Sequence, residues 1–286
     1  GMPNFVFLLV TSTLGGLAWL LYKRQSTAQP GEPEQIVEPV VGESAEASWD
    51  DVQLVDVLGM EVGHRLIPMV DPTQKGKLLE RIKSVRKKFA QSVGFLPPVV
   101  HIRDNLELGT NAYSVLLKEA VIGTGEVYPD RFLAINAGDI TGQVEGIEVV
   151  DPAFGLPAVW VESEHREHAQ IYGYTVVDAS TVIATHLNHL MHKHAGELLR
   201  RQEVQQLLER LGAAGEALVD EVIDKKLSLS ELQRLLQSLL AEQVPIRDLC
   251  SILETVSELN DPGADMTART DRVRIALGRA ITQQWF

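Results

Sequence analysis

Apolar and polar positions follow two different patterns in the first half of this 286-residue chain. Between Lys75 and Val93, apolar residues recur at three- and four-residue steps and Gly94 follows, which predicts an amphipathic helix with a glycine stop. Short β-branched and apolar runs predict strands; they cover residues 52–62 continuing through 66–70, then 99–102, 112–121, 132–135, 158–161 and 174–177. This half is therefore expected to be mixed α/β.

From Ala179 onward the strand patterns stop and amphipathic helical patterns replace them. Ser230 and Gln233 have capping-box spacing, and Pro245 suits the start of a helix. Cys250 falls on an apolar helical face, so it is expected to pack rather than to react. The predicted organisation is a first α/β subdomain (52–130 and 179–198), a small inserted α/β subdomain (131–178) and a helical subdomain (199–286).

The N-terminal residues are predicted to form a transmembrane helix over residues 1–23. Residues 5–22 carry no charge and would span about 27 Å as a helix, nearly the thickness of one hydrocarbon core. Lys23 and Arg24 follow this stretch, which argues against a cleaved signal peptide and places the remainder in the cytoplasm. A buried core helix is the alternative, because Gly15 and Gly16 weaken the hydropathy.

Residues 24–51 are predicted to be a flexible acidic linker. Between Ser26 and Asp51 the chain is rich in Pro, Gly and Ser and has seven carboxylates without Lys or Arg, so it buries too little apolar surface to offset its ordering entropy. Trp49 is the exception. It is either an anchor that docks on a folded surface or the first packed residue of the next domain.

Composition narrows the class of protein further. The 39 acidic and 26 basic side chains give a formal charge of -13, which argues against nucleic acid as the main partner. An apolar share of 45% is enough for a sizeable core, and the length suggests roughly two domains. The single cysteine, Cys250, cannot form an intramolecular disulfide, so the cytosol is the default compartment.

The search for catalytic motifs returns none that is complete. The Lys75–Lys77 stretch lacks the glycine and hydroxyl of a phosphate loop, and Gly123–Gly125 lacks the third glycine of a dinucleotide fingerprint. The basic residues of the 75–93 helix suit its solvated face, with an acidic partner or lipid headgroups as the alternative. No catalytic residue or cofactor is predicted.

Four histidines fall close together at His186, His189, His192 and His194. Three of them recur at three-residue steps, and neighbours at that spacing on a helix share a face that can bind a metal. No carboxylate or cysteine is placed among them, however, so a membrane-anchored metal-binding enzyme is only the alternative hypothesis and no metal ligand is assigned. His165 and His168 are expected on the surface.

The segment DPAFGLPAVW at residues 151–160 is predicted to form a rigid loop. Two prolines and a glycine restrict its path, and Phe154 lies among small residues three positions after Asp151. Phe154 is either the aromatic anchor of a recognition groove or a plug that fills the core under a turn.

Four long strings resemble the FHIPEP family, the export-gate proteins of the flagellar type III secretion apparatus and of virulence injectisomes. They are DPAFGLPAVW, YTVVDASTVIATHLNHL at 174–190, VPIRDLCSILETV at 244–256 and ALGRAITQQWF at 276–286. The resemblance implies a membrane bundle, a linker and a cytoplasmic region that assembles into a nine-membered ring. The chain would match the last membrane helix, the linker and three cytoplasmic subdomains, without the earlier helices and the final subdomain.

The resemblance also implies partners and a site. In this family the cytoplasmic ring docks export chaperones with their substrates and communicates with the stalk of the ATPase complex. The matching positions are Asp151, Phe154 and Thr185, with Val177 and Val182 as apolar lining, and Trp49 would anchor the linker on an adjacent protomer. The expected function is therefore a docking and gating platform at the inner membrane, not an enzyme. The flagellar version is preferred, and an injectisome gate is the alternative.

Overall fold

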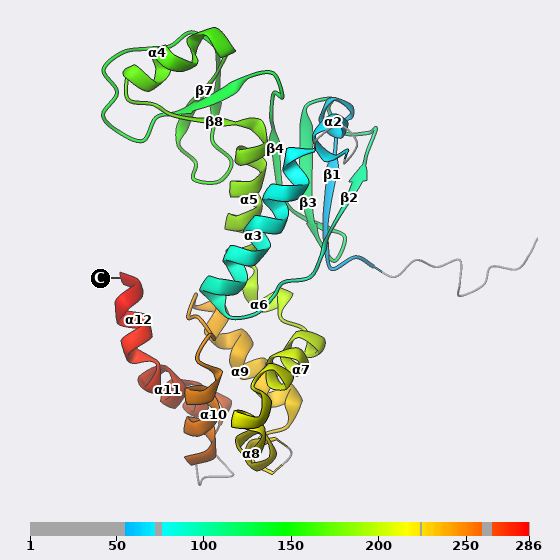
Figure 1. Cartoon of the computed structure of the whole chain (residues 1–286), viewed down its shortest axis with the longest axis vertical. Helices are drawn as coiled ribbons and strands as arrows, with labels where there is room; N and C mark the ends of the chain where they lie inside the picture. The colour runs from blue at the N-terminus through cyan, green and yellow to red at the C-terminus, as the bar shows by residue number, and fades with distance from the viewer. Residues whose placement is uncertain (1–54, 72–75, 224, 259–264, 286) are drawn as a thin grey trace, which may run out of the picture. The chain divides into compact units, whose positions relative to one another are not determined.

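The computed structural model describes residues 55–71, 76–223, 225–258 and 265–285 (Figure 1). The predicted transmembrane helix at 1–23 and the acidic linker at 24–51, with Trp49, lie outside these residues. Across the described part of the chain, no helix has the length and the hydropathy that crossing a membrane would require.

A four-stranded sheet with the order β2-β1-β3-β4 forms the first part of the fold. Its strands are β1 (Leu58–Val62), β2 (Val100–Asp104), β3 (Ala112–Leu117) and β4 (Ala120–Glu126). Strand β1 pairs with β2 in parallel and with β3 antiparallel. The parallel pair needs a crossover connection, and α3 (Lys77–Val93) supplies it.

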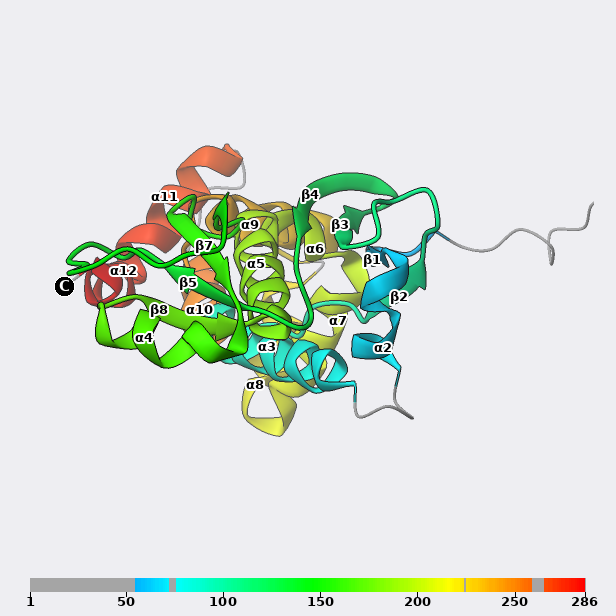
Figure 2. The same ribbon diagram turned by 90° about the horizontal axis from the view of Figure 1, so that it is seen from above.

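Helices α3 and α5 (Ala179–Lys193) pack side by side and share one core with the first sheet (Figures 1 and 2). In α3 the buried residues Leu78, Ile82, Phe89 and Val93 lie on one stripe, as the sequence pattern predicted. Gly94 ends this helix with a φ of 116°, a left-handed conformation that only glycine adopts at little cost.

A second four-stranded sheet, with the order β6-β7-β5-β8, lies between β4 and α5 in the sequence. Its strands are β5 (Phe132–Ile135), β6 (Ile147–Val150), β7 (Pro157–Val161) and β8 (Thr175–Asp178), and all of its pairs are antiparallel. Helix α4 (Arg166–Ile171) accompanies it, and a small separate core holds Ala134, Val161, Ala169 and Tyr174. The chain enters on β5 and leaves on its neighbour β8, so this sheet is inserted into the first fold.

Helices make up the rest of the described chain, with one isolated β-bridge among the described residues. They are α6 (Ala195–Leu198), α7 (Arg201–Arg210), α8 (Gly212–Val222), α9 (Leu229–Ala241), α10 (Leu249–Glu258), α11 (Met266–Ala276) and α12 (Gly278–Trp285). The change from strands to helices after Ala179 and the mixed α/β class are therefore confirmed.

Several local predictions were wrong. The predicted strand at residues 66–70 is wrong, because Leu66 ends the 3₁₀ turn η2 (His64–Leu66) and the rest forms α2 (Ile67–Val70), with Pro68 in the first helical turn. The capping box of α9 is Ser228 with Glu231, two residues before the predicted pair. Cys250 is exposed rather than packed, because α10 begins at Leu249 and turns its second residue outward.

The start of α5 depends on Asp178, which accepts four hydrogen bonds. One carboxylate oxygen accepts from the Thr181 amide at 2.8 Å, the Ser180 hydroxyl at 2.6 Å and the Thr181 hydroxyl at 3.0 Å. The other accepts from Arg81 of α3 at 2.7 Å. Burial raises the pKa of Asp178, but these hydrogen bonds and the Arg81 charge outweigh it, so the pKa lies below its usual value.

We predict that Asp178→Ala lowers the free energy of unfolding by about 1–2 kcal/mol, because it removes the N-cap of α5. Chemical denaturation at neutral pH measures this loss. Arg81→Gln is the matched control: it removes only a partly exposed ion pair and should cost about 0–1 kcal/mol. Equal losses in the two variants would contradict the assignment of the cap as the main contribution.

Candidate functional site

Asp151 takes part in four hydrogen bonds that close the loop between β6 and β7. The Asp151 amide donates to the Leu156 carbonyl at 2.8 Å, and the Gly155 amide donates to the Asp151 carbonyl at 2.9 Å. The Asp151 carboxylate accepts from the amides of Ala153 at 3.1 Å and Phe154 at 2.7 Å. Gly155 has a φ of 69°, which allows the chain to turn back at this point.

Phe154 stands out from this loop. Its side chain is 63% exposed, so the alternative that it plugs the core under a turn is wrong. Its ring meets His189 of α5 edge to face, with 6.5 Å between ring centroids. An exposed aromatic ring on a fixed backbone is the kind of anchor that protein–protein interfaces use, because little conformational entropy is lost when it is buried.

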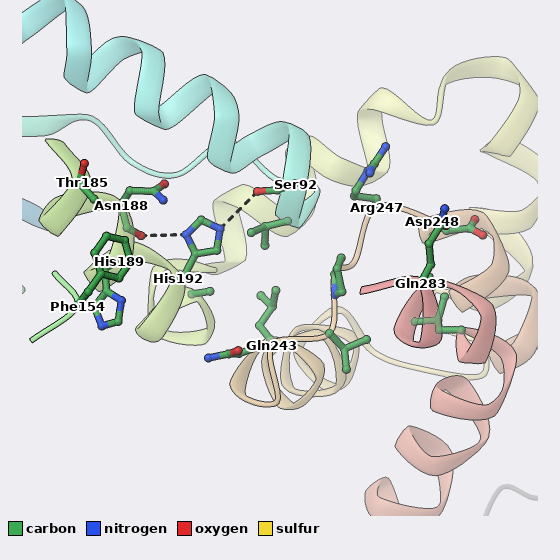
Figure 3. A pocket seen from close by; sticks show the side chains of 17 residues that line it. Ser92, Phe154, Thr185, Asn188, His189, His192, Gln243, Arg247, Asp248 and Gln283 are labelled. Atoms are coloured by element: carbon green, nitrogen blue, oxygen red, sulfur yellow. Dashed lines mark hydrogen bonds between the residues drawn. The ribbon is translucent and has the colours of Figure 1, made fainter. Parts of the chain in front are cut away.

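Phe154 lies at the edge of a cavity of about 1040 Å³ (Figure 3). Helix α5 contributes Thr185, Asn188, His189 and His192 to its wall. The other walls come from the end of α3, the α9–α10 connection and α12; their residues include Ser92, Val93, Leu240, Gln243, Val244, Pro245, Arg247, Asp248, Leu277, Ala280 and Gln283. In Figure 3, Phe154 and His189 lie at one end of the cavity, and Arg247, Asp248 and Gln283 lie at the other.

His192 fixes the wall between these ends. Its Nδ1 donates to the Asn188 carbonyl at 2.9 Å, and its Nε2 lies 3.4 Å from the Ser92 hydroxyl of α3. Its ring also meets Phe89 edge to face at 4.9 Å between centroids. The histidine thus joins α5 to α3 where both helices border the cavity.

The structure brings together only some of the predicted site residues. Phe154 and Thr185 line the same cavity. Asp151 is only 3% exposed and is bonded to its own loop, so its position suits holding Phe154 rather than meeting a partner. Val182 is buried in the core, and Val177 borders a different cavity of about 560 Å³ beside the start of α5, so neither lines the Phe154 cavity.

The four clustered histidines have four different environments. His186 is buried against Tyr113, His189 faces Phe154, His192 bonds to Asn188, and His194 pairs with Glu197 at 2.8 Å. In the described ranges no three His, Cys, Asp or Glu side chains are grouped so that they could hold a metal ion. The alternative hypothesis of a metal-binding enzyme therefore loses its structural basis. His165 and His168 are exposed, as predicted.

Sequence reasoning missed most of the cavity. Asn188, His189 and His192 could have been found, because they follow Thr185 by three, four and seven residues and so share its helical face. The walls formed by residues 240–248 and 277–283 gave no such signal, because tertiary packing alone brings them to α5.

Comparison with known proteins identifies the family. The family model described as "FHIPEP family" matches residues 1–286. The chain belongs to the FHIPEP family.

Curated relatives of this FHIPEP chain are named as flagellar proteins. The chain is 55% identical over 286 residues to the flagellar biosynthesis protein FlhA of Salmonella typhimurium, and 55% identical to that of Escherichia coli. In both cases the match covers 100% of this chain and 41% of the relative, so the chain spans about two fifths of the length of these curated relatives. This FHIPEP family consists of secretion export-gate proteins, not enzymes.

Solved structures support the same fold. The CdsV protein of Chlamydia pneumoniae superposes with a TM-score of 0.70 and 27% identity, covering 82% of this FHIPEP chain and 69% of CdsV. The nonameric SctV-C of EPEC superposes with a TM-score of 0.60 and 22% identity, covering 79% of this chain and 67% of that one, which shows the fold alone.

His186 makes stability depend on pH. Its side chain is 4% exposed; burial first, and then the nearby His189, lower its pKa, while Asp151 partly opposes them. A lowered pKa means that the unfolded chain binds a proton more readily than the folded chain. The contribution of His186 is therefore fully present above about pH 6.5, the ordinary histidine pKa, and is lost as the pH falls below it.

We predict that the melting temperature of the wild type falls more between pH 7.5 and pH 5.5 than that of His186→Asn, which cannot take up a proton. The difference should be about 1–3 °C, since 1 kcal/mol corresponds to a shift of about 2–4 °C for a domain of this size. Thermal melts at both pH values measure it. His165→Asn, an exposed histidine variant, should behave like the wild type; a His186→Asn variant that keeps the full wild-type drop would contradict the prediction.

Proposed function

We propose that this FHIPEP chain is the docking part of a flagellar type III export gate, which binds chaperone–substrate complexes at the cavity beside Phe154. One observation carries the proposal: an aromatic side chain that is 63% exposed stands on a rigid loop at the mouth of a cavity of about 1040 Å³. The site has no catalytic arrangement, and its mixed apolar and polar walls suit a protein partner.

We assign each residue of the site a role that follows from the chemistry of its side chain. Phe154 receives an apolar anchor of the chaperone, and Thr185 presents a small polar wall beside it. The Asp151 carboxylate accepts a hydrogen bond from the Phe154 amide and so keeps the Phe154 backbone in place. The polar far end, with Arg247, Asp248 and Gln283, offers hydrogen bonds that fix the orientation of the bound partner.

Assembly and location follow from the same proposal. A nonameric relative supports a homo-oligomeric ring, and a solved complex of CdsV with CdsO supports contact with a further protein, for which we propose the stalk of the ATPase complex. The described residues would lie on the cytoplasmic side of the inner membrane, joined to it through residues 1–51.

The flagellar version is favoured over an injectisome gate. The curated relatives at 55% identity are both named as flagellar biosynthesis proteins. Parallel binding measurements with flagellar and injectisome chaperones distinguish the two; tighter binding to an injectisome chaperone would support the second candidate.

We predict that Phe154→Ala weakens chaperone binding by about 10- to 100-fold, because burying a phenylalanine side chain contributes about 1.5–3 kcal/mol. The melting temperature should stay within about 2 °C of the wild type, since an exposed side chain contributes little to stability. Isothermal titration calorimetry and thermal melts measure the two quantities.

Ile171→Ala is the matched control for this experiment. Ile171 is a large apolar residue of the inserted sheet region that is 74% exposed and does not line the cavity. Its loss should leave chaperone affinity unchanged. If Phe154→Ala and Ile171→Ala weaken binding equally, the cavity is not the docking site.

Trp49 generates a separate prediction about assembly. As an aromatic residue in an acidic linker, it is proposed to anchor on a neighbouring protomer. Trp49→Ala should lower the fraction of ring-sized particles in analytical ultracentrifugation at matched protein concentration. Unchanged assembly would remove the anchor role and leave the docking proposal intact.

A further inference from the structure

A buried hydrogen-bonded pair joins the first sheet to helix α5, which forms one wall of the proposed docking site. The Tyr113 side chain of β3 is 1% exposed and His186 of α5 is 4% exposed, and 2.8 Å separates the hydroxyl of Tyr113 from Nδ1 of His186. The two rings also meet edge to face, with 5.8 Å between centroids. The pair thus ties the first sheet to the helix that forms one wall of the cavity.

Two glycines of β4 make room for this pair. A Cβ atom on Gly125 would lie 2.7 Å from the Tyr113 hydroxyl oxygen, and one on Gly123 would lie 3.1 Å from Nε2 of His186. A larger residue at Gly125 would displace the Tyr113 ring, and one at Gly123 would first meet Cδ1 of Leu190 on α5, at 2.5 Å. The glycine pattern at 123–125, which is incomplete as a nucleotide motif, is therefore explained by packing around Tyr113, His186 and Leu190.

The protonation states of the pair suit its hydrogen bond. Burial, and secondly the Asp151 charge, raise the pKa of Tyr113, so its hydroxyl keeps its proton. Burial lowers the pKa of His186, so its ring is neutral near pH 7 and Nδ1 can accept from that hydroxyl. The Asp151 charge raises the pKa of both groups.

Two connections lead from the pair to Phe154. His189, three residues after His186 on α5, meets the Phe154 ring. Asp151, whose charge acts on both members of the pair, accepts a hydrogen bond from the Phe154 amide at 2.7 Å. We propose that Tyr113 and His186 are positioning residues of the docking site: their hydrogen bond holds α5 against β3 so that His189 and the Asp151 loop keep Phe154 exposed at the cavity.

This inference rests on the proposed docking function for its meaning, but its test requires no chaperone. Hydrogen–deuterium exchange of the Ala153 and Phe154 amides reports the order of the loop directly. In Tyr113→Phe, which removes one hydroxyl and keeps the ring, these amides should exchange at least fivefold faster than in the wild type. Amides of α9 should keep their wild-type rates.

Two further comparisons separate positioning from packing. His186→Asn keeps an acceptor near the place of Nδ1 and should retain slow exchange, whereas His186→Leu should lose it. Tyr174→Phe removes the hydroxyl of a buried tyrosine in the inserted sheet's own core and should leave the two loop amides unchanged. If His186→Leu does not fold, the test is the comparison of loop-amide exchange in Tyr113→Phe with that in His186→Asn.

Exchange within twofold of the wild type in Tyr113→Phe would overturn the positioning role, whatever happens to the melting temperature. Equal acceleration in His186→Asn and His186→Leu would overturn it as well. A chaperone titration keeps the two proposals apart. Faster exchange of the loop amides in Tyr113→Phe supports positioning whether or not the wild type binds a chaperone. A wild type that binds no chaperone would refute the docking proposal alone.

Discussion

The position of helix α5 is the constraint on which the rest of the described fold depends. Asp178 caps its first turn and binds Arg81 of α3, and His186 in its middle bonds to Tyr113 of the first sheet. Just beyond α6, the Leu199 carbonyl accepts from Gln233 and Gln237 of α9 at 3.2 Å and 2.9 Å. Helix α5 is thus fastened to both sheets, and the segment that follows it is fastened to α9, so a shift at any of these points would act on the cavity wall that α5 forms.

The cavity owes its other walls to backbone contacts rather than to a local motif. The Ile246 amide donates to the Val93 carbonyl at 2.8 Å, and a Cβ atom on Gly94 would lie 2.6 Å from the Arg247 amide nitrogen. Gly94 therefore has two roles, since it ends α3 and lets the α9–α10 connection approach closely. This contact closes the side of the cavity opposite Phe154, and it explains why residues more than ninety positions apart share one site.

The elements that could be predicted from sequence are those in which local signals agree. Helix α3 has an apolar stripe and a glycine stop, and β5 has a short apolar run between turns, so both were found. Residues 66–70 were misassigned because a short apolar run fits a strand or a buried helix equally well. Strand β6 was missed because it is a largely exposed edge strand that lacks a continuous apolar pattern.

The candidate site, too, could be predicted from the sequence only in part. A rigid loop around Phe154 follows from its prolines and glycine, whereas the exposure of Phe154 could not be predicted, because a core plug and a surface anchor have the same residue type. The burial of Val182 and the separation of the four histidines depend on which face of α5 meets β3 and β4. Amphipathic spacing gives that face only approximately, and the space left by Gly123 for Leu190 and His186 has no signal in the α5 sequence itself.

The insertion of the second sheet has an evolutionary consequence. Its first and last strands pair directly, with Phe132 opposite Asp178, so the two ends of the inserted chain leave the parent fold side by side. An insertion with adjacent ends adds little loop-closure cost to its host and keeps a core of its own. The outer part of this segment, which has its own small core, can therefore vary, whereas Leu133, Ala158 and Trp160 pack into the same core as α5 and the first sheet and tie the insertion to them.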